Sequence, residues 1–288
     1  MDCLYPRSMV VCSKDGKSQL EGHRITVPCN HCIACRIRRT QEWSIRLLME
    51  DTQWPCSCYL TLTYDDFHLP TTPCGKHPLD KEELRGFWKR LRAAIRRRDD
   101  SRRLRYYACG EYGDLFGRPH YHAIVFGIDF ADEQDFKDAN LAWQYRGKVD
   151  FKPVCASDIA YVCNYVSKKL FYDPMDELME YGCVQPPFKT QSQGLALSFF
   201  EKDRKQFEKG YFVYKGCRRS IPRLFLKKDE LLKQLVGNSF IENEYNEILN
   251  NIGRSRKDIE DDAKKQLMSR LQHNADLVAK HALRSRKF

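Results

Sequence analysis

The sequence has no uninterrupted apolar run near the roughly 20 residues that a membrane-crossing helix needs. Its first residues lack the basic and then apolar layout of a secretory signal peptide. A Gly-x-x-x-x-Gly-Lys-Ser/Thr motif is also missing, so no nucleotide-triphosphate motor is recognisable. We therefore expect a chain that works without a membrane in a reducing cytoplasm and relies on another protein for any ATP-driven step.

The charge of the chain is strongly one-sided. Its 49 Lys and Arg residues exceed its 39 Asp and Glu residues, for a formal net charge of +10. This excess favours a polyanionic partner such as nucleic acid. The densest basic run lies in a predicted helix over 80–98, and its alternative reading is an ordinary solvated helix face. The predicted DNA-binding residues are Arg85, Lys89, Arg92, Arg96, Arg97, Arg118 and Lys169.

The 13 cysteines are an odd number, and without an export signal we expect reduced thiols rather than a disulfide framework. Cys29, Cys32 and Cys35 have the C-x-x-C-x-x-C spacing of a structural Zn²⁺ site. The alternative is a set of small buried thiols at a turn. The candidates for a fourth ligand are Cys12, Cys56, Cys58 and His31.

Hydrophobic periodicity and turn residues predict an α+β fold, and 42% hydrophobic residues are enough for a real core. Helices are expected over 34–51, 80–98, 132–143 and 157–170, and strands over 58–64, 104–109, 121–126, 148–154 and 211–214. Residues 1–28 and the loop 181–194 read as irregular. We predict a Cys-rich N-terminal segment over 1–57, a core over 58–226, and a helical C-terminal extension over 227–288 with a break near Gly253.

The segment 110–126 reads as the end of one strand, a loop with two glycines and a proline, and a second strand. Strand side chains alternate between faces, so His120 and His122 point the same way. An antiparallel partner would bring Glu111 beside His120. Two imidazoles and a carboxylate then suit a divalent metal with open coordination positions. The alternative is that the two histidines only pack or lie on the surface.

A second group of residues lies on the helix over 157–170. Tyr161 and Tyr165 are four positions apart and share a face, and Lys168 lies on that face too. Such a pair is usually part of an aromatic core. Beside a metal site and a basic surface, however, the two phenols indicate attack of a tyrosine on a DNA phosphodiester. A phenol with a pKa near 10 is about one part in a thousand ionised at pH 7, a handicap of about 4 kcal/mol. A nearby ammonium and a metal-polarised phosphate can offset it.

These motifs resemble the HUH superfamily of rolling-circle replication initiators. The resemblance rests on His120-Tyr121-His122 and on Tyr161-x-x-x-Tyr165-x-x-Lys168, with the strand 59–64 similar to the superfamily's first motif. The cysteine segment, the stretch 110–122 and Ile221-Pro222-Arg223 are more similar to the replication initiators of gokushoviruses, small single-stranded DNA phages. The resemblance covers roughly residues 29–226.

The resemblance implies a five-stranded antiparallel HUH-endonuclease sheet with flanking helices. It implies a site-specific nickase that initiates and terminates rolling-circle replication through a 5′-phosphotyrosine, with Mg²⁺ or Mn²⁺ as cofactor at Glu111, His120 and His122. A host helicase and DNA polymerase would be its partners in a bacterial cytoplasm. Two alternatives remain: a transposase or plasmid relaxase of the same superfamily, and a non-catalytic zinc and nucleic-acid binding module.

Overall fold

The computed structural model describes residues 3, 5–10, 24–30, 32–114, 116–169, 182, 184–214 and 216–236, without the side chains of 24–26, 165–169 and 217. The chain packs as two units, Arg39–Asp203 and Met1–Arg38 together with Arg204–Phe288. These units follow packing rather than chain order, and the predicted division at 57 and 226 stays a prediction. In the part of the chain that the structure describes, no helix combines the length and hydropathy that a membrane crossing requires.

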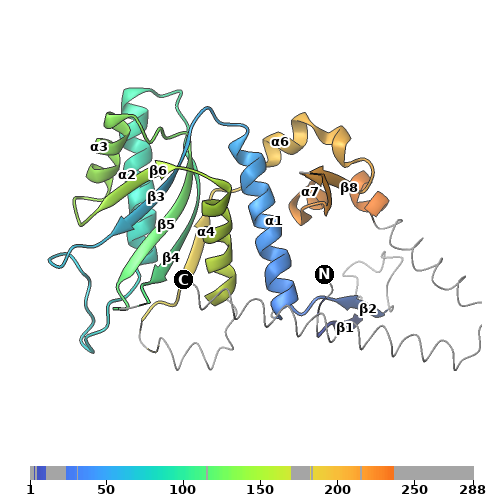
Figure 1. Ribbon diagram of the computed structural model, residues 1–288, viewed down its shortest axis with the longest axis horizontal. Coiled ribbons are helices and arrows are strands. Elements are labelled where there is room, and N and C mark those ends of the chain that lie inside the picture. The colour runs from blue at the N-terminus through green and yellow to red at the C-terminus, as the bar shows by residue number, and fades with distance from the viewer. Residues whose placement is uncertain are drawn as a thin grey trace, which may run out of the picture. The chain divides into compact units, whose positions relative to one another are not determined.

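The unit Arg39–Asp203 is built on an antiparallel sheet of five strands (Figure 1), as the sequence predicts. Its strands are β3 (Ser57–Thr63), β4 (Arg105–Tyr112), β5 (Pro119–Phe126), β6 (Val149–Pro153) and β7 (Phe188–Gln191). Their order across the sheet is β6-β3-β5-β4-β7. The predicted loop over 181–194 is therefore wrong where β7 pairs with the edge of β4. A four-residue strand beside two prolines has too little periodicity to be seen in the sequence.

One face of the sheet is covered by α2 (Lys81–Arg98) and α3 (Glu133–Ala142) (Figure 1). Both begin where the sequence predicts, because the Asp80 and Asp132 side chains accept hydrogen bonds from the first backbone amides of each helix. Phe87 and Leu91 of α2 are fully buried in a core that includes alternate sheet residues such as Tyr121. Burial of an aliphatic or aromatic side chain of this kind stabilises by about 1.5–3 kcal/mol.

The contact between α2 and α3 is fixed by buried charge. The Asp135 side chain is completely buried, and it accepts hydrogen bonds from Arg98 and, at 2.7 Å, from Arg102. Arg98 also pairs with Asp138 at 2.8 Å. Burial favours the neutral acid, but these hydrogen bonds and positive charges outweigh it, so the pKa of Asp135 is lowered below its ordinary 3.8. Part of the basic run at the end of α2 is therefore structural.

The other face of the sheet is covered by α1 (Ile33–Asp51) and α4 (Ala156–Lys169) (Figure 1), at the predicted positions. Leu47 of α1 and Val162 of α4 are fully buried in a second core, together with Ile124 of β5. Since alternate residues of a strand share a face, His120 and His122 lie on the same face as Ile124. The predicted metal ligands therefore lie on the side of the sheet that α4 covers.

The second unit contains two short hairpins, β1 (Arg7–Val10) with β2 (Arg24–Val27), and β8 (Tyr211–Tyr214) with β9 (Cys217–Ser220). The prediction that residues 1–28 are irregular is wrong for β1 and β2, whereas the predicted strand over 211–214 is confirmed. The rings of Phe207, Phe212 and Phe225 pack together beside β8, joined by the short helices η1 (Arg204–Phe207) and α7 (Arg223–Lys228). A further helix, α6 (Leu197–Lys202), follows β7 in the first unit. The helices predicted beyond 236 lie outside the described residues.

Candidate active site

The pairing of β4 with β5 brings three ionisable side chains together. Glu111 lies directly opposite His120 in the register, as predicted, and His122 follows on the same face. The Glu111 Oε1 atom is 2.7 Å from His120 Nε2 and 3.0 Å from His122 Nε2. One donor atom from each of the three residues lies within 4.8 Å of the others. The geometry therefore gathers two imidazoles and one carboxylate at a single point.

The other nitrogen of each imidazole is held from behind. His120 Nδ1 is 3.1 Å from the backbone carbonyl of Arg118, which can only accept, so this nitrogen donates. His122 Nδ1 is 2.7 Å from the Tyr59 hydroxyl and 3.1 Å from Thr61 Oγ1, both on β3. A hydrogen bond at one ring nitrogen fixes the ring and directs the other nitrogen to a metal. Both Nε2 atoms consequently face the carboxylate.

The carboxylate of Glu111 is almost completely inaccessible, with 1% of the residue exposed. Burial favours its neutral form, but the hydrogen bonds and charge of the two histidines outweigh burial and lower its pKa. Burial likewise lowers the pKa of His120, yet Glu111 raises it more, so the net shift is upward. Among the described residues, Glu111 Oε2 has no hydrogen-bond partner. A buried carboxylate oxygen without a partner, beside two oriented imidazoles, fits a divalent cation.

Tyr161 of α4 contacts the same carboxylate. Its hydroxyl donates a hydrogen bond to Glu111 Oε1 at 3.1 Å, and its ring stands perpendicular to that of His122 with centroids 5.6 Å apart. Burial and the negative charge of Glu111 raise the pKa of this phenol. The residue is still 38% exposed, so a ligand from solvent can reach it. Tyr161 is thus next to the metal-ligand group and not part of a sealed aromatic core.

Three other predicted residues belong to the end of α4. The backbone of Tyr165, Lys168 and Lys169 is helical, which agrees with the spacing on which the prediction depends. Their side chains lie outside the described residues. Their predicted roles as second nucleophile, activating ammonium and DNA contact stay predictions.

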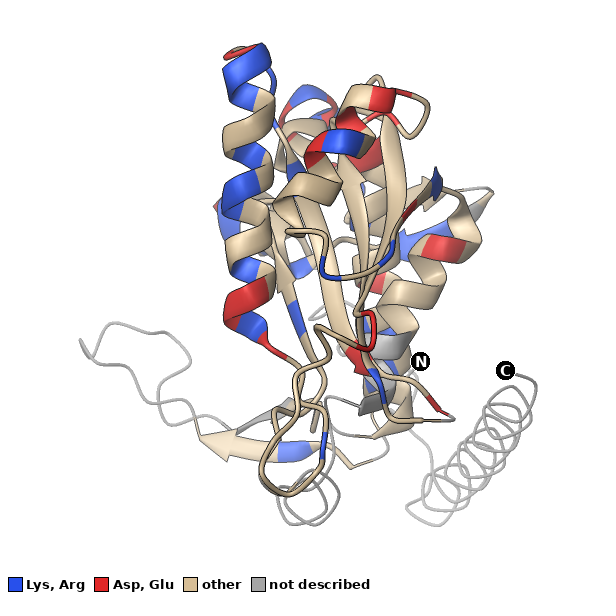
Figure 2. Cartoon of the chain, turned by 90° about the vertical axis from the view of Figure 1, so that its left-hand side faces the viewer, with Lys and Arg blue, Asp and Glu red and all other residues tan. Residues whose placement is uncertain are grey.

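The basic residues of α2 lie on the face of the sheet opposite to Glu111 and the histidines. Figure 2 shows Lys and Arg recurring along this helix. Lys89, Arg96 and Arg97 are exposed, as is Arg85, which pairs with Glu82 at 3.3 Å. Arg92 lies 5.3 Å from the ring of Tyr106. The predicted position of this patch beside the metal site is wrong, because α2 packs on one face of the sheet and β4 presents Glu111 on the other.

Arg118 lies in the turn before β5, close to the histidines in sequence. Its guanidinium donates to Asp66 at 2.5 Å and to the Tyr64 carbonyl at 3.0 Å, which attaches the turn to the end of β3. Side-chain exposure is 39% for Arg118 and 91% for Asp66. A pair this exposed is screened by water and contributes little to stability. The predicted DNA contact of Arg118 would compete with this pair.

Two side chains that orient His122, Tyr59 and Thr61, have no role predicted from the sequence. Both lie in the predicted strand 58–64, on the same face by alternation, so the strand itself was found. What the sequence does not give is which strand lies beside β5. Without the pairing of Thr61 with His122, the two hydroxyls have no visible partner.

The predicted cysteine cluster is present, but its fourth member differs from the prediction. Cys29, Cys32 and Cys35 lie together with Cys3, and their sulfur atoms are all within 4.8 Å of one another. Of the four predicted candidates, Cys58 is fully buried in the core beneath α2, and Cys56 precedes β3 in the same unit. Cys12 and His31 lie outside the described residues. The C-x-x-C-x-x-C spacing identified the three, and Cys3 was missed because it lies far away in the sequence.

Comparison with known proteins gives one family and several relatives. Residues 57–170 match a family of replication-associated proteins that is named after ORF2. The chain is 32% identical to Replication-associated protein ORF4 of Chlamydia phage 1, over 80% of this chain and 60% of that protein. It is 31% identical to Replication-associated protein VP4 of Bdellovibrio phage phiMH2K, over 69% of this chain and 65% of that protein.

A third relative is Replication-associated protein ORF2 of Spiroplasma virus 4, at 27% identity over 71% of this chain and 68% of that protein. The chain thus spans a little under two thirds of the length of the first two relatives. No solved structure matches it. The matched family region contains β3 to β6 and α4, and therefore every residue of the Glu111 site.

Proposed function

We propose, from the homology of this chain to phage replication-associated proteins, that it is a replication initiator acting as a metal-dependent, site-specific single-strand DNA nickase. It cuts at an origin, stays attached to the 5′ end through a phosphotyrosine, and reseals a unit-length circle. The reaction class is phosphodiester transesterification by tyrosine. Rolling-circle replication of a phage genome is initiated and terminated by the same chemistry.

The observation that supports this proposal most strongly is the position of Tyr161. Its hydroxyl lies 3.1 Å from the carboxylate oxygen that both histidines contact. A nucleophile and a metal-ligand set in hydrogen-bond reach of each other are what an in-line attack on a phosphate requires. Because Tyr161 is partly exposed, a DNA strand can lie over it without unfolding α4.

Glu111, His120 and His122 would hold Mg²⁺ or Mn²⁺, with open positions for phosphate oxygens. When bound, the ion would supply charge stabilisation at the non-bridging oxygens of the scissile phosphate. The chain's own residues do the rest. The Tyr161 oxygen forms a bond to phosphorus, the bond to the 3′ oxygen breaks, and the phenol's proton is lost while the leaving oxygen gains one. Glu111 Oε1 accepts the hydrogen bond of the phenol and orients its oxygen.

The second tyrosine gives the reaction a way to end. Tyr165 follows Tyr161 by one helical turn, so two phenols of one helix can serve successive cuts. One retains the old 5′ end while the other attacks the newly made junction, and the freed 3′ hydroxyl then displaces the retained tyrosine. Energy is conserved in the phosphoester at each exchange, so sealing needs no nucleotide cofactor.

The basic face of α2 would bind DNA flanking the cut, since it lies on the opposite side of the sheet from Tyr161. Replacing Lys89 and Arg96 together with Ala should weaken single-strand binding and lower the slope of log affinity against log salt by about 0.7 for each phosphate that is no longer neutralised. The cleavage rate at saturating DNA should not change. A fall in that rate would instead put α2 in contact with the reacting strand. A host helicase and DNA polymerase in the bacterial cytoplasm would supply strand separation and synthesis.

The decisive test uses full-length protein, a labelled single-stranded origin oligonucleotide and Mn²⁺. We expect a covalent complex that survives denaturation and is lost when Tyr161 and Tyr165 are both replaced with Phe. Tyr64→Phe, which removes a phenol from the opposite sheet face, is the matched control and should retain the complex. An adduct formed by the double variant would refute the proposal. Binding without any adduct would indicate a non-catalytic module, and cleavage of transposon ends rather than origins would indicate a transposase.

A further inference from the structure

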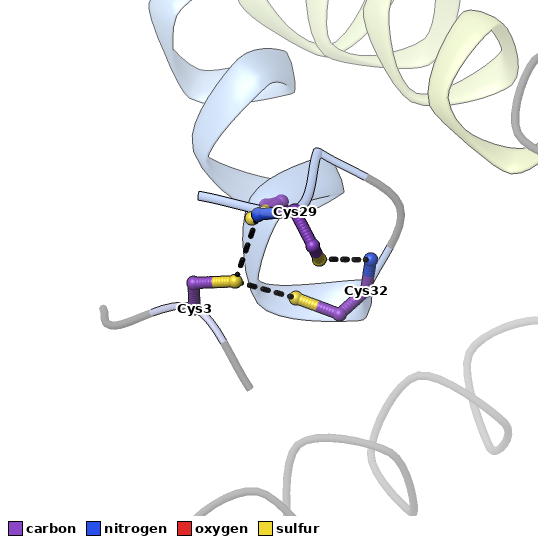
Figure 3. Close-up of side chains that lie close together, drawn as sticks. Cys3, Cys29 and Cys32 are labelled. Carbon is purple, nitrogen blue, oxygen red and sulfur yellow. Dashed lines mark hydrogen bonds between the residues drawn. The ribbon is translucent and has the colours of Figure 1, made fainter. Parts of the chain in front are cut away.

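The four cysteines of the second unit form a group that the nickase chemistry does not use. Cys3 lies before β1, Cys29 follows β2, and Cys32 and Cys35 lie at the start of α1 (Figure 3). The geometry points to a closed, four-thiolate structural Zn²⁺ site completed by Cys3. This inference is independent of the proposed function, because the site shares no residue with Glu111, His120 or His122.

The sulfur spacing matches a single tetrahedral ion. Zn–S bonds are about 2.3 Å long, which places sulfur atoms about 3.8 Å apart at the corners of a tetrahedron. Cys3 Sγ and Cys32 Sγ are 3.9 Å apart, and all four sulfurs lie within 4.8 Å of one another. Disulfide sulfurs are about 2.05 Å apart, so this pair is not bonded. One ion can therefore reach all four donors after shifts of less than an ångström or so.

Backbone amides already point at the sulfur atoms, as Figure 3 shows. The amide of Cys29 donates to Cys3 Sγ at 3.1 Å, and the amide of Cys32 donates to Cys29 Sγ at 3.3 Å. Asn30, between them, has a φ of 66°, the left-handed conformation that turns the chain back on itself. Hydrogen bonds of this kind stabilise thiolates and orient them around a metal. A cluster of neutral thiols would have less need of them.

Charge and helix position support thiolates at the same place. Cys32 and Cys35 flank the first turn of α1, where the helix dipole favours negative charge. The Arg38 guanidinium lies 4.0 Å from Cys35 Sγ, and four thiolates around a divalent ion leave a net charge of −2 that this cation offsets. Four sulfur donors select zinc or iron over Mg²⁺ and Mn²⁺, which prefer oxygen ligands.

Because all four positions are taken by protein ligands, such a site would be structural and not catalytic. It would tie Cys3 to the start of α1 across a long loop, and its binding free energy would be folding free energy for the second unit. The two sites would therefore respond differently to chelators. EDTA removes a labile ion from an open site readily, and an ion buried among four thiolates slowly.

The test is metal analysis of the full-length protein combined with zinc X-ray absorption. We expect one zinc per chain with a first shell of sulfur only, retained after dialysis against EDTA and unchanged in Glu111→Gln. Cys3→Ser should lose its zinc to a chromophoric chelator at least 10- to 100-fold faster, the range for weaker outer-shell losses. Cys3→His, which offers another zinc ligand, should recover most of the retention. Cys74→Ser, which removes an exposed thiol elsewhere, is the matched control.

Three results would overturn the inference. One is wild-type protein without sulfur-coordinated metal when purified without chelators. Another is iron in place of zinc, and the third is equal zinc retention in Cys3→Ser and wild type. The absorption spectrum of the wild type tests the inference even if Cys3→Ser fails to fold.

Discussion

Replacing Glu111 with Gln tests the metal site with the smallest possible change. The amide has the shape of the carboxylate but no charge, and it presents one acceptor oxygen instead of two. In the native site one carboxylate oxygen contacts both histidines, and the other is buried without a partner among the described residues. We expect Glu111→Gln to fold but not to bind Mn²⁺, because a neutral amide oxygen replaces the only anionic ligand.

The expected size of the effect follows from linkage. A cation at 100 times its dissociation constant stabilises the native state by about 2.7 kcal/mol if it does not bind the unfolded chain. For a domain of this size, 1 kcal/mol moves Tm by about 2–4 °C, so Mn²⁺ should raise the wild-type Tm by about 5–10 °C. The same addition should move the Tm of Glu111→Gln by less than about 1 °C. Comparing each variant with and without Mn²⁺ cancels the direct effect of the substitution on stability.

The assay is differential scanning calorimetry over a Mn²⁺ titration in EDTA-treated protein. Asp66→Asn is the control, since it removes an exposed carboxylate that pairs only with Arg118 among the described residues. It should shift with Mn²⁺ like the wild type. If Glu111→Gln shows the wild-type shift, the ion binds elsewhere and the assignment of Glu111, His120 and His122 as ligands is wrong.

Two further substitutions test the supports of the site and of the fold. Tyr59→Phe removes the hydroxyl 2.7 Å from His122 Nδ1 and should weaken Mn²⁺ binding about 10-fold in isothermal titration, whereas Tyr64→Phe on the other sheet face should not. Equal affinities in the two variants would show that Tyr59 does not orient the imidazole. Asp135→Asn should lower the free energy of unfolding by about 2 kcal/mol at pH 7, measured in urea, because it removes the buried partner of Arg102. Since the pKa of Asp135 is lowered on folding, this difference should be present above pH 3.8 and shrink as the pH falls below it; a constant difference would contradict the pairing.

Local signals carried most of the fold prediction. Asp80 and Asp132 cap helices within a residue of the expected starts, and the alternation of β5 placed the two histidines on one face. The segments that were missed are short. β7 and the hairpin of β1 with β2 are four residues per strand, and they become strands only through pairing with chain distant in sequence.

The same limit applies to the candidate site. Glu111 and the histidines come from adjacent strands joined by a short turn, so hairpin geometry alone brought them together. The supports of His122 come from β3, whose position beside β5 no local pattern reveals. Cys3 joins the cysteine cluster from the other end of a long connection for the same reason. Proximity in sequence also misled: the basic helix α2 precedes the hairpin directly and lies on its far face.

The most direct measurement is identification of the DNA-linked residue. Full-length protein is incubated with an origin oligonucleotide and Mn²⁺, digested with nuclease and protease, and analysed by mass spectrometry for a nucleotide-bearing peptide. We predict a 5′-phosphate ester on Tyr161 or Tyr165 and a free 3′ hydroxyl on the released strand. A nucleotide on any other residue, or a cut that leaves both ends free of protein, would contradict tyrosine transesterification at the Glu111 site.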